Sequence, residues 1–541
     1  MANIFQTVRT ARPRRSLFDL SHERKFSCKF GQLVPIYLEE VVPGDRFRVN
    51  TEMLLRMAPM LAPVMHRVNV YTHFFFVPNR LVWNEWQDFI TGGPDGDANP
   101  VFPRLRIDSE AVTNGDEFFS AGKLPDYLGV PVLDPHRDFS GEFDVSALPF
   151  RAYQLIYNEY YRDQNLEEPV EFSLDSGIIK SGYGVDYRNL VLMRYRAWEK
   201  DYFTSALPWA QRGGDVRLPL AGDAPVYRDS SSSYGALVSN PLTASENAPL
   251  YAGGDGNRRL LVGDDDDGVP VPFSYDPAGS LKVDMSNVSS STINELRSAF
   301  SLQKWLERNA RGGSRYVEQI LSHFGVKVPD YRIQRPEYLG GGKSPVVISE
   351  VLQTSATDPN ETPLAEMAGH GISVGNTHQF KKFFSEHGHI VGIMSILPRT
   401  AYQNGVNRHL RKFDRFDYYF PEFAHLGEQT VFSSELYLDN SNVAARDEIF
   451  GYQSRYAEYK YAQSSVHGDF RDNLAYWHLG RIFNSPPRLN SSFVKLDPEL
   501  AGMDRIFAVE SPYFDKIFVQ LYNNVRAVRP MPYYGTPGGL I

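Results

Sequence analysis

The fold is decided by residues 67–77, whose sequence is RVNVYTHFFFV. Most of these side chains are β-branched or aromatic, and Pro78 follows the run directly. Such a composition is typical of a β-strand, because branched and aromatic side chains pack well on a pleated surface. The same pattern, bounded by Pro or Gly, predicts further strands on both sides of it, at residues 26–38, 45–50, 346–351, 390–397, 430–438 and 505–528.

Short helices are expected between these strands. Residues 83–90 carry one apolar helical face that ends at Gly92, and residues 149–165 carry another, with Pro149 suited to the first turn. A helical pair is expected after residue 291, its two members ended by Gly312 and Gly325. The order of strands, helices and strands again favours one β core with long excursions over a chain of separate domains.

Composition excludes several classes of protein. Cys28 is the only cysteine among the 541 residues, so an intramolecular disulfide and a cysteine-based zinc cluster are both excluded. No apolar run reaches the roughly 18 residues that span a bilayer, and residues 1–15 are basic and polar, unlike a signal peptide. We therefore expect a soluble protein that is made in a cytoplasm and inserts into no membrane.

Charge is unevenly distributed along the chain. The net charge is −9, yet residues 1–30 hold seven basic and two acidic groups, and residues 213–290 hold five basic and eleven acidic groups. Gly, Ser and Pro make up 28 of the 78 residues in the second segment, which is typical of a long surface insertion; a disordered linker is the alternative. The basic arm and the acidic segment therefore suit different surroundings, one near a polyanion and the other near solvent.

Four short motifs resemble catalytic or ligand-binding sites, and each lacks an essential part. The GISVG run around Ser373 has no strand before it and no clear helix after it, and the GKS run around Lys343 lacks the first Gly of a phosphate-binding loop. The acidic run that ends at Asp267 lacks calcium ligands at the required spacing, and His387 and His389 lack further metal ligands nearby. We expect no catalytic, cofactor-binding or metal-binding residues, although paired carboxylates cannot be recognised from sequence alone.

A set of longer motifs resembles the major capsid proteins of the Microviridae, in the gokushovirus branch. The motifs cover nearly the whole chain except residues 213–290: RRSLFDLS (14–21), TEMLLRMAP (51–59), VYTHFFFVPNR (70–80) with Trp83 and Trp86, LPFRAY (148–153), YRAWEKDYF (195–203), GHIVG (388–392) and FGYQSRY (450–456). The resemblance implies a mainly β fold, a single eight-stranded antiparallel jelly roll of the viral capsid type with long loop insertions and a few short helices. It implies no enzymatic activity and no cofactor.

The resemblance also implies an organisation of the chain. Residues 1–30 would form a basic N-terminal arm, residues 31–212 the first part of the jelly roll, residues 213–290 a surface insertion that protrudes at the threefold axis, and residues 291–541 a helical excursion and the remaining strands. The genome-facing candidates are Arg9, Arg12, Arg14 and Arg15. The candidates for the protrusion and host attachment are Tyr227, Leu237, Tyr251, Leu260, Phe273, Asp264, Asp265, Asp266 and Asp267.

The implied function is that of a structural protein. Copies of the chain would form pentamers and a small icosahedral T=1 shell around circular single-stranded DNA. The partners would be internal scaffolding and minor virion proteins and a host surface receptor, and the protein would be assembled in the bacterial host cytoplasm and located in the virion. The competing hypothesis is a β-rich glycan-binding protein or glycan hydrolase, which the abundant aromatic residues would suit.

Overall fold

The computed structural model divides the chain into two compact units. The first comprises Met1–Arg212 and Glu307–Ile541, and the second is Gly213–Leu306. No described helix is long and apolar enough to cross a membrane. The structure describes residues 14–108, 118–133, 141–180, 185–214, 216, 226–228, 250–252, 260–264, 270–272, 281–283, 293–352, 367–439, 441–509, 511 and 514–534.

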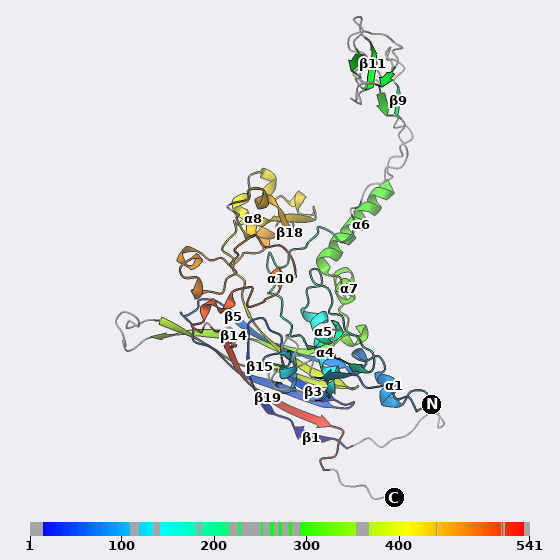
Figure 1. The fold of residues 1–541 in the computed structure, drawn as a ribbon, viewed down its shortest axis with the longest axis vertical. Coiled ribbons are helices and arrows are strands. Elements are labelled where there is room, and N and C mark those ends of the chain that lie inside the picture. The colour runs from blue at the N-terminus through cyan, green and yellow to red at the C-terminus, as the bar shows by residue number, and fades with distance from the viewer. Residues whose placement is uncertain are drawn as a thin grey trace. The chain divides into compact units, whose positions relative to one another are not determined.

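The first unit is built on a large curled antiparallel sheet (Figure 1). Its strands pair in the order β1-β19-β4-β15-β14-β5-β16-β3, and β2 also pairs with β19. The strands are β1 (Ser16–Asp19), β2 (His22–Cys28), β3 (Val34–Val41), β4 (Arg46–Met57), β5 (Val68–Pro78), β14 (Glu337–Leu352), β15 (Met367–Phe383), β16 (Gly388–Pro398) and β19 (Ile517–Arg529). This mainly β architecture is consistent with a jelly roll.

Strand β14 joins two halves of the sheet. Its residues from Glu337 to Val346 pair with β5, and those from Val347 to Leu352 pair with β15. One half therefore holds β1, β2, β19, β4 and β15, and the other holds β14, β5, β16 and β3. We call them the β4 half and the β5 half.

The main core lies between the two halves. Strand β4 alternates exposed and buried residues, and its buried members, such as Phe47 and Val49, pack in one cluster with Val70 and Phe74 of β5. Such alternation means that β4 has one face in the core and the other outside it.

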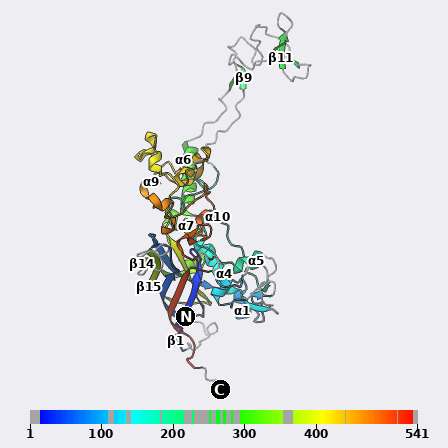
Figure 2. The same cartoon turned by 60° about the vertical axis from the view of Figure 1, so that its left-hand side comes forward.

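Strand β5 is buried on both faces. Phe75 and Val77 point away from the main core into a second cluster, which contains Trp83, Tyr153 and Ile156. In Figure 2 the helices α1, α4 and α5 lie on one side of the strands, where this second cluster is formed. The covering elements are α1 (Trp86–Thr91), α3 (Leu124–Leu128), α4 (Leu148–Ile156), the π-helical turn Tyr157–Tyr161, α5 (Val185–Val191) and a small sheet of β6 (Arg104–Ile107), β7 (Phe143–Ser146) and β8 (Ile178–Ile179).

A third cluster holds together a lobe formed from the loops. Phe203, Phe450 and Phe493 meet there in edge-to-face contacts, with Phe450 and Phe493 ring centroids 5.1 Å apart. The elements around it are β17 (Glu428–Phe432), α8 (Ser433–Leu436), β18 (Ile449–Ser454), α9 (Ala457–Lys460) and α10 (Ser491–Val494). Short 3-10 turns occur at Asn79–Leu81, Asp330–Ile333, Arg408–Arg411, Arg415–Asp417, Pro421–Phe423, Ala444–Asp447, Gly468–Arg471, Ala475–Trp477 and Met503–Ile506.

The second unit contains two small antiparallel sheets. Strands β9 (Val226–Arg228) and β13 (Leu281–Val283) pair with each other, and β10 (Leu250–Ala252), β11 (Leu260–Asp264) and β12 (Pro270–Pro272) form the other sheet. Helix α6 (Ile293–Gly312) begins in this unit, and α7 (Tyr316–Phe324) follows in the first unit.

Several sequence predictions are confirmed, and others are wrong in part. The expected strands at residues 67–77 and 390–397 are β5 and β16, and the helix ends at Gly92 and Gly325 are confirmed as left-handed caps. The single strand expected over residues 26–38 is two strands, because the chain turns at Gly31, where φ is 76° and a Cβ atom would lie 2.2 Å from the carbonyl oxygen of Leu496.

Two expected strands at the C-terminal side are too long. Residues 433–436 form helix α8 instead of continuing β17, because the side chain of Glu435 accepts a hydrogen bond from the backbone N–H of Phe432 and stabilises the first turn. Residues 503–506 form a 3-10 turn, and β19 begins only at Ile517.

Candidate functional site

The serine of the GISVG run has a structural role. Ser373 lies within strand β15, is buried, and donates a hydrogen bond from its Oγ to the carbonyl oxygen of Pro345 at 2.8 Å. A nucleophilic serine needs a sharp turn between a strand and a helix, so a strand interior cannot present it to a substrate. Lys343 likewise lies in strand β14, where its Nζ is 3.5 Å from a carboxylate oxygen of Glu199.

His389 of strand β16 and His387, which directly precedes the strand, contact different side chains. His389 Nδ1 lies 3.0 Å from Oδ1 of Asn79, and burial lowers the pKa of His389 to about 4. The ring of His387 instead packs against Trp86 with 5.6 Å between centroids. Among the described residues no three His, Cys, Asp or Glu side chains are grouped to hold a metal ion.

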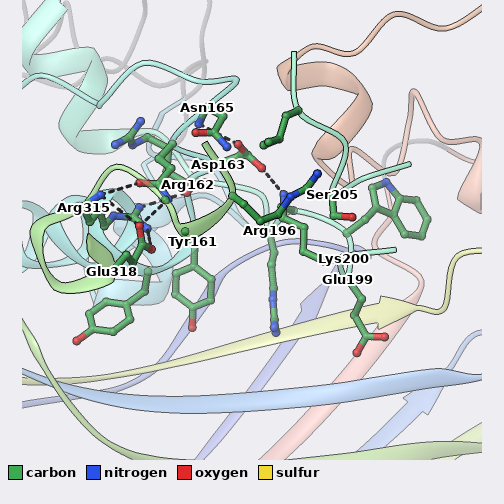
Figure 3. Close-up of a pocket in the computed structure, with 18 of the residues that line it drawn as sticks. Tyr161, Arg162, Asp163, Asn165, Arg196, Glu199, Lys200, Ser205, Arg315 and Glu318 are labelled. Carbon is green, nitrogen blue, oxygen red and sulfur yellow. Dashed lines mark hydrogen bonds and ion pairs between the residues drawn. The ribbon is translucent and has the colours of Figure 1, made fainter. Parts of the chain in front are cut away.

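A polar cavity of about 1120 Å³ lies in the first unit (Figure 3). The wall is formed by the π-helical turn Tyr157–Tyr161 and the chain after it, the segment around Trp198, the end of α6 and the start of α7. Its charged side chains pair mainly with one another. Asp163 pairs with Lys200, Arg315 Nη1 lies 3.3 Å from Glu318, and Arg335 Nε lies 2.9 Å from Asp330. The first pair joins two segments 37 residues apart and the other two are local, so these charges are neutralised within the wall and have a structural role.

Arg196 and Glu199 occupy the part of the cavity next to strand β5. The Arg196 guanidinium lies 4.4 Å from the Tyr71 ring centroid and donates to Ser395 Oγ at 2.9 Å. Burial acts to raise the pKa of Glu199, but a hydrogen bond from the Tyr71 hydroxyl and the charge of Lys343 outweigh it, so the pKa lies below its usual value. A carboxylate held ionised in this way is a poor general acid.

The structure describes two of the four predicted genome-facing arginines. Arg14 and Arg15 are exposed just before β1, and the Arg15 guanidinium lies 5.8 Å from the Phe383 ring centroid at the end of β15. Arg9 and Arg12 lie outside the described residues. The described base of the basic arm is therefore next to one end of the β4 half.

A group of exposed cations that the sequence analysis missed lies at this same end. Arg46 and Arg48 of β4, Lys381 of β15 and Arg526 of β19 all lie on the face that is turned away from the core. Their signal in the sequence is the alternation of Arg with buried residues along residues 46–49, which the expected strand at residues 45–50 contained. Strands β15 and β19 could not be paired with β4 from the sequence.

The candidates for the protrusion are only partly described. Tyr227 lies in β9, Tyr251 in β10, and Leu260 and Asp264 at the two ends of β11. Tyr227 is thus in one small sheet of the second unit, and the other three residues are in its other sheet. Leu237, Phe273, Asp265, Asp266 and Asp267 lie outside the described residues.

The loop lobe exposes many aromatic side chains. Phe413 is 87% exposed, and Phe416, Tyr418, Tyr419 and Phe420 follow it within the next seven residues, all of them exposed. Clustered exposed rings of this kind are typical of surfaces that contact other molecules.

Comparison with known proteins identifies the family. A family model described as capsid protein (F protein) matches residues 6–539. Capsid protein VP1 of Chlamydia phage 1 is 38% identical to this chain, covering 99% of the chain and 98% of the relative. Capsid protein VP1 of Bdellovibrio phage phiMH2K is 34% identical over 98% of the chain and 97% of the relative, and that of Spiroplasma virus 4 is 31% identical over 97% and 95%.

The role of these relatives agrees with the lack of catalytic geometry at the motifs described above. Each of them is named as a capsid protein, which is a structural component of a virion and not an enzyme. The chain belongs to the capsid protein (F protein) family of the Microviridae, and its role is to form a virion shell with other copies of itself.

Proposed function

We propose that this chain is the major capsid protein of a small icosahedral T=1 shell that encloses circular single-stranded DNA. The observation that carries this proposal is the match to the capsid family along residues 6–539, which leaves no large part of the chain for another activity. A glycan hydrolase is set aside, because the relatives are named as structural proteins.

We further propose that the sheet is a single eight-stranded jelly roll. Strands β1 and β2 both pair with β19 and follow one another in sequence, so they count as one interrupted first strand. The β4 half and the β5 half then hold four strands each, facing one another across the main core. This arrangement suits a capsid subunit, since jelly rolls of two facing sheets recur in viral shells.

Electron cryo-microscopy of particles formed by the full-length protein tests the proposal. We expect shells of 60 subunits, the number that T=1 symmetry requires, whose DNA survives external nuclease and, after extraction, resists exonuclease but not a single-strand endonuclease. Particles that never contain DNA, or an assembly without icosahedral symmetry, would contradict it.

The basic arm is proposed to lie inside the shell, near the DNA. Phosphate neutralisation by Arg9, Arg12, Arg14 and Arg15 would be independent of sequence and sensitive to salt. Replacing all four with Gln should lower the DNA content or the stability of the particles while the subunit still folds. Unchanged particles would favour the alternative, in which the arm is a solvated tail that clamps a neighbouring subunit.

Contacts between subunits are proposed to use exposed aromatic side chains. The rings at Phe413, Phe416 and Tyr419 are candidates in the loop lobe, and Tyr316 and Phe324 are candidates on α7, where the apolar face is exposed. Interfaces favour large rings of this kind. Alanine at such positions should prevent assembly before it unfolds the subunit.

Residues 213–290 are proposed to form a protrusion at the threefold axis that attaches to a host receptor. Three copies of the apolar residues named above could bury surface that one copy cannot hide, and the acidic run from Asp264 would remain hydrated. Deletion of the interior of the segment should leave assembly possible and remove host attachment. Normal adsorption of the deleted particles would refute the receptor role, and a failure to assemble would identify a structural clamp.

The remaining partners follow from the proposed role. Internal scaffolding proteins and minor virion proteins are proposed to accompany assembly, which would take place in the cytoplasm of the bacterial host. Copurification with immature particles would test these partners.

A further inference from the structure

The face of the β4 half that is turned away from the core carries a row of cations. Arg48 is opposite Arg526 of β19 on one side and opposite Lys381 of β15 on the other. All three side chains are exposed, and Arg46, also exposed, lies two residues from Arg48 on the same face. We call Arg46, Arg48, Lys381 and Arg526 the basic row.

The basic row is electrostatically unfavourable in the isolated subunit. Directly opposed residues on neighbouring strands have Cβ atoms about 4.5–5.5 Å apart, and like charges at that distance repel one another. Within the described part of the chain, Arg526 pairs with Asp19 at 2.8 Å, while no ion pair joins Arg46, Arg48 or Lys381 to a carboxylate. The repulsion is therefore only partly relieved within the subunit.

The surroundings of the row suit a single-stranded nucleic acid. Phe383 lies opposite Arg46 and is 46% exposed, so it offers a ring for a base. The next residues along the strands are amides, with Asn50 between Asn524 and Gln379. Amide side chains donate hydrogen bonds to phosphate oxygens and bases alike.

The row is also positioned where the basic arm begins. Arg15 contacts Phe383, so the arm leaves the sheet at the end that carries the cations. Further along the same face the charges become mixed, because Glu52 of β4 and Glu23 of β2 both flank Tyr522 of β19. The cations are therefore concentrated at one end of a rigid sheet whose opposite face is packed in the core.

We propose that the basic row binds the phosphate backbone of single-stranded DNA, as a fixed extension of the contacts proposed for the arm. This inference rests on the proposed function, since it assigns the DNA-binding face of the shell. A protein partner is less favoured. The row would pair best with several negative charges in succession, each next to a group that can stack on an aromatic ring, and every nucleotide supplies one phosphate and one base.

The test compares two double variants of the full-length protein, each of which removes one Arg charge and one Lys charge but from different places. The variant R48Q/K381Q removes one Arg and one Lys from the row, and the control R56Q/K25Q removes one Arg and one Lys from the far end of the same face. A third variant, R48K/K381R, keeps both charges. Cooperative thermal unfolding near the melting temperature of the wild type would show that all of them fold, as expected for exposed side chains.

Binding of the unassembled protein to a fluorescent 20-residue oligothymidylate is measured at several salt concentrations. Each lost phosphate contact should reduce the slope of log K against log salt by about 0.7, so R48Q/K381Q should reduce it by about 1.4. That change corresponds to roughly 25-fold weaker binding at 0.1 M salt relative to a 1 M reference. The R56Q/K25Q control and the R48K/K381R variant should bind as the wild type does.

Three results would overturn the inference. Equal weakening in R48Q/K381Q and R56Q/K25Q would show that only net charge matters, and unchanged binding in R48Q/K381Q would show that the row contacts no phosphate. Loss of shell formation with unchanged oligonucleotide binding would identify the row as a contact with a neighbouring subunit. Wild-type particles that hold no DNA would instead contradict the proposed function, so the two failures are distinguishable.

Discussion

The two halves of the sheet are buried differently, although the same main core lies between them. The outer face of the β5 half is covered by helices and a second apolar cluster, whereas the outer face of the β4 half carries charged and amide side chains and is exposed. Strand β5 accordingly has no exposed face, while every second residue of β4 is buried. The chain thus covers one sheet face with its own excursions and leaves the other exposed.

The largest expected effect comes from breaking the covered half. Phe74 and Phe75 are neighbours on β5 that enter different clusters, and both are buried. Phe74→Ala and Phe75→Ala should each cost about 3–5 kcal/mol of unfolding free energy, because each leaves a cavity in a packed cluster. Urea denaturation of the unassembled protein measures this.

Two neighbouring residues of the β4 half should differ in how much their replacement lowers the unfolding free energy. On β4, Phe47→Ala should cost about 3–5 kcal/mol and Arg48→Ala less than about 0.5 kcal/mol, since only the first side chain is in the core. If Phe75→Ala were as mild as Arg48→Ala, the helices would not cover β5 in solution.

A smaller effect is expected from the buried arginine of the helical cover. Arg151 of α4 is fully buried and donates hydrogen bonds to the carbonyl oxygens of Val82 at 3.0 Å and Asp175 at 2.9 Å. Arg151→Ala should cost about 2–4 kcal/mol, because the buried carbonyl group of Val82 and the partly buried one of Asp175 lose their partner. Thermal unfolding measures the loss, and the variant Arg151→Lys should recover only part of it, since one ammonium group cannot reproduce the planar fork.

Acid should weaken the contact between β16 and the start of the helical cover. The pKa of His389 is lowered by burial from 6.5 to about 4, so the unfolded chain binds a proton more readily between these values. The stabilising contribution is present above pH 6.5 and is lost as pH falls toward 4, by about 3 kcal/mol. The variant His389→Asn should show a flatter dependence of stability on pH over this range, and an unchanged slope would place the titration elsewhere.

The smallest effect concerns the exposed half and has the opposite sign. Lys381→Gln should raise the unfolding free energy by about 0.2–0.5 kcal/mol, because it removes a like charge opposite Arg48. The gain should shrink in high salt. A loss of stability at low salt would mean that the lysine makes a favourable contact in the subunit.

The sequence predicted the covered half of the fold better than the exposed half. The runs that became β5 and β16 are dominated by β-branched, aromatic and other apolar residues, so they could be recognised without knowing their partners. Strand β15 was missed, because it begins with the glycine-rich residues around Gly371, which carry no strand pattern. Glycine is required there by contacts with residues distant in sequence, since a Cβ atom at Gly369 would lie 2.3 Å from the carbonyl oxygen of Ala62.

The candidate site was predicted only where it is continuous in sequence. Arg14 and Arg15 stood out as part of a basic arm, but Lys381 and Arg526 are isolated in sequence and become neighbours of Arg48 only through strand pairing. The first half of β14 was missed for a similar reason. Gly341 leaves room for the backbone of β5, and a Cβ atom there would lie 2.2 Å from the carbonyl oxygen of Thr72, a contact that no local pattern reveals.

The place of β19 in the sheet has a consequence for how the subunit is made. This strand lies between β4 and the first strands, β1 and β2, although nearly the whole chain separates it from them in sequence. Translation at about 5–20 residues per second delays it by on the order of a minute after β4 has emerged. Until then β4 has an open hydrogen-bonding edge, which can pair wrongly or recruit a chaperone. A subunit truncated before β19 would therefore lack a central strand of the β4 half, so we expect that it could not assemble into a shell.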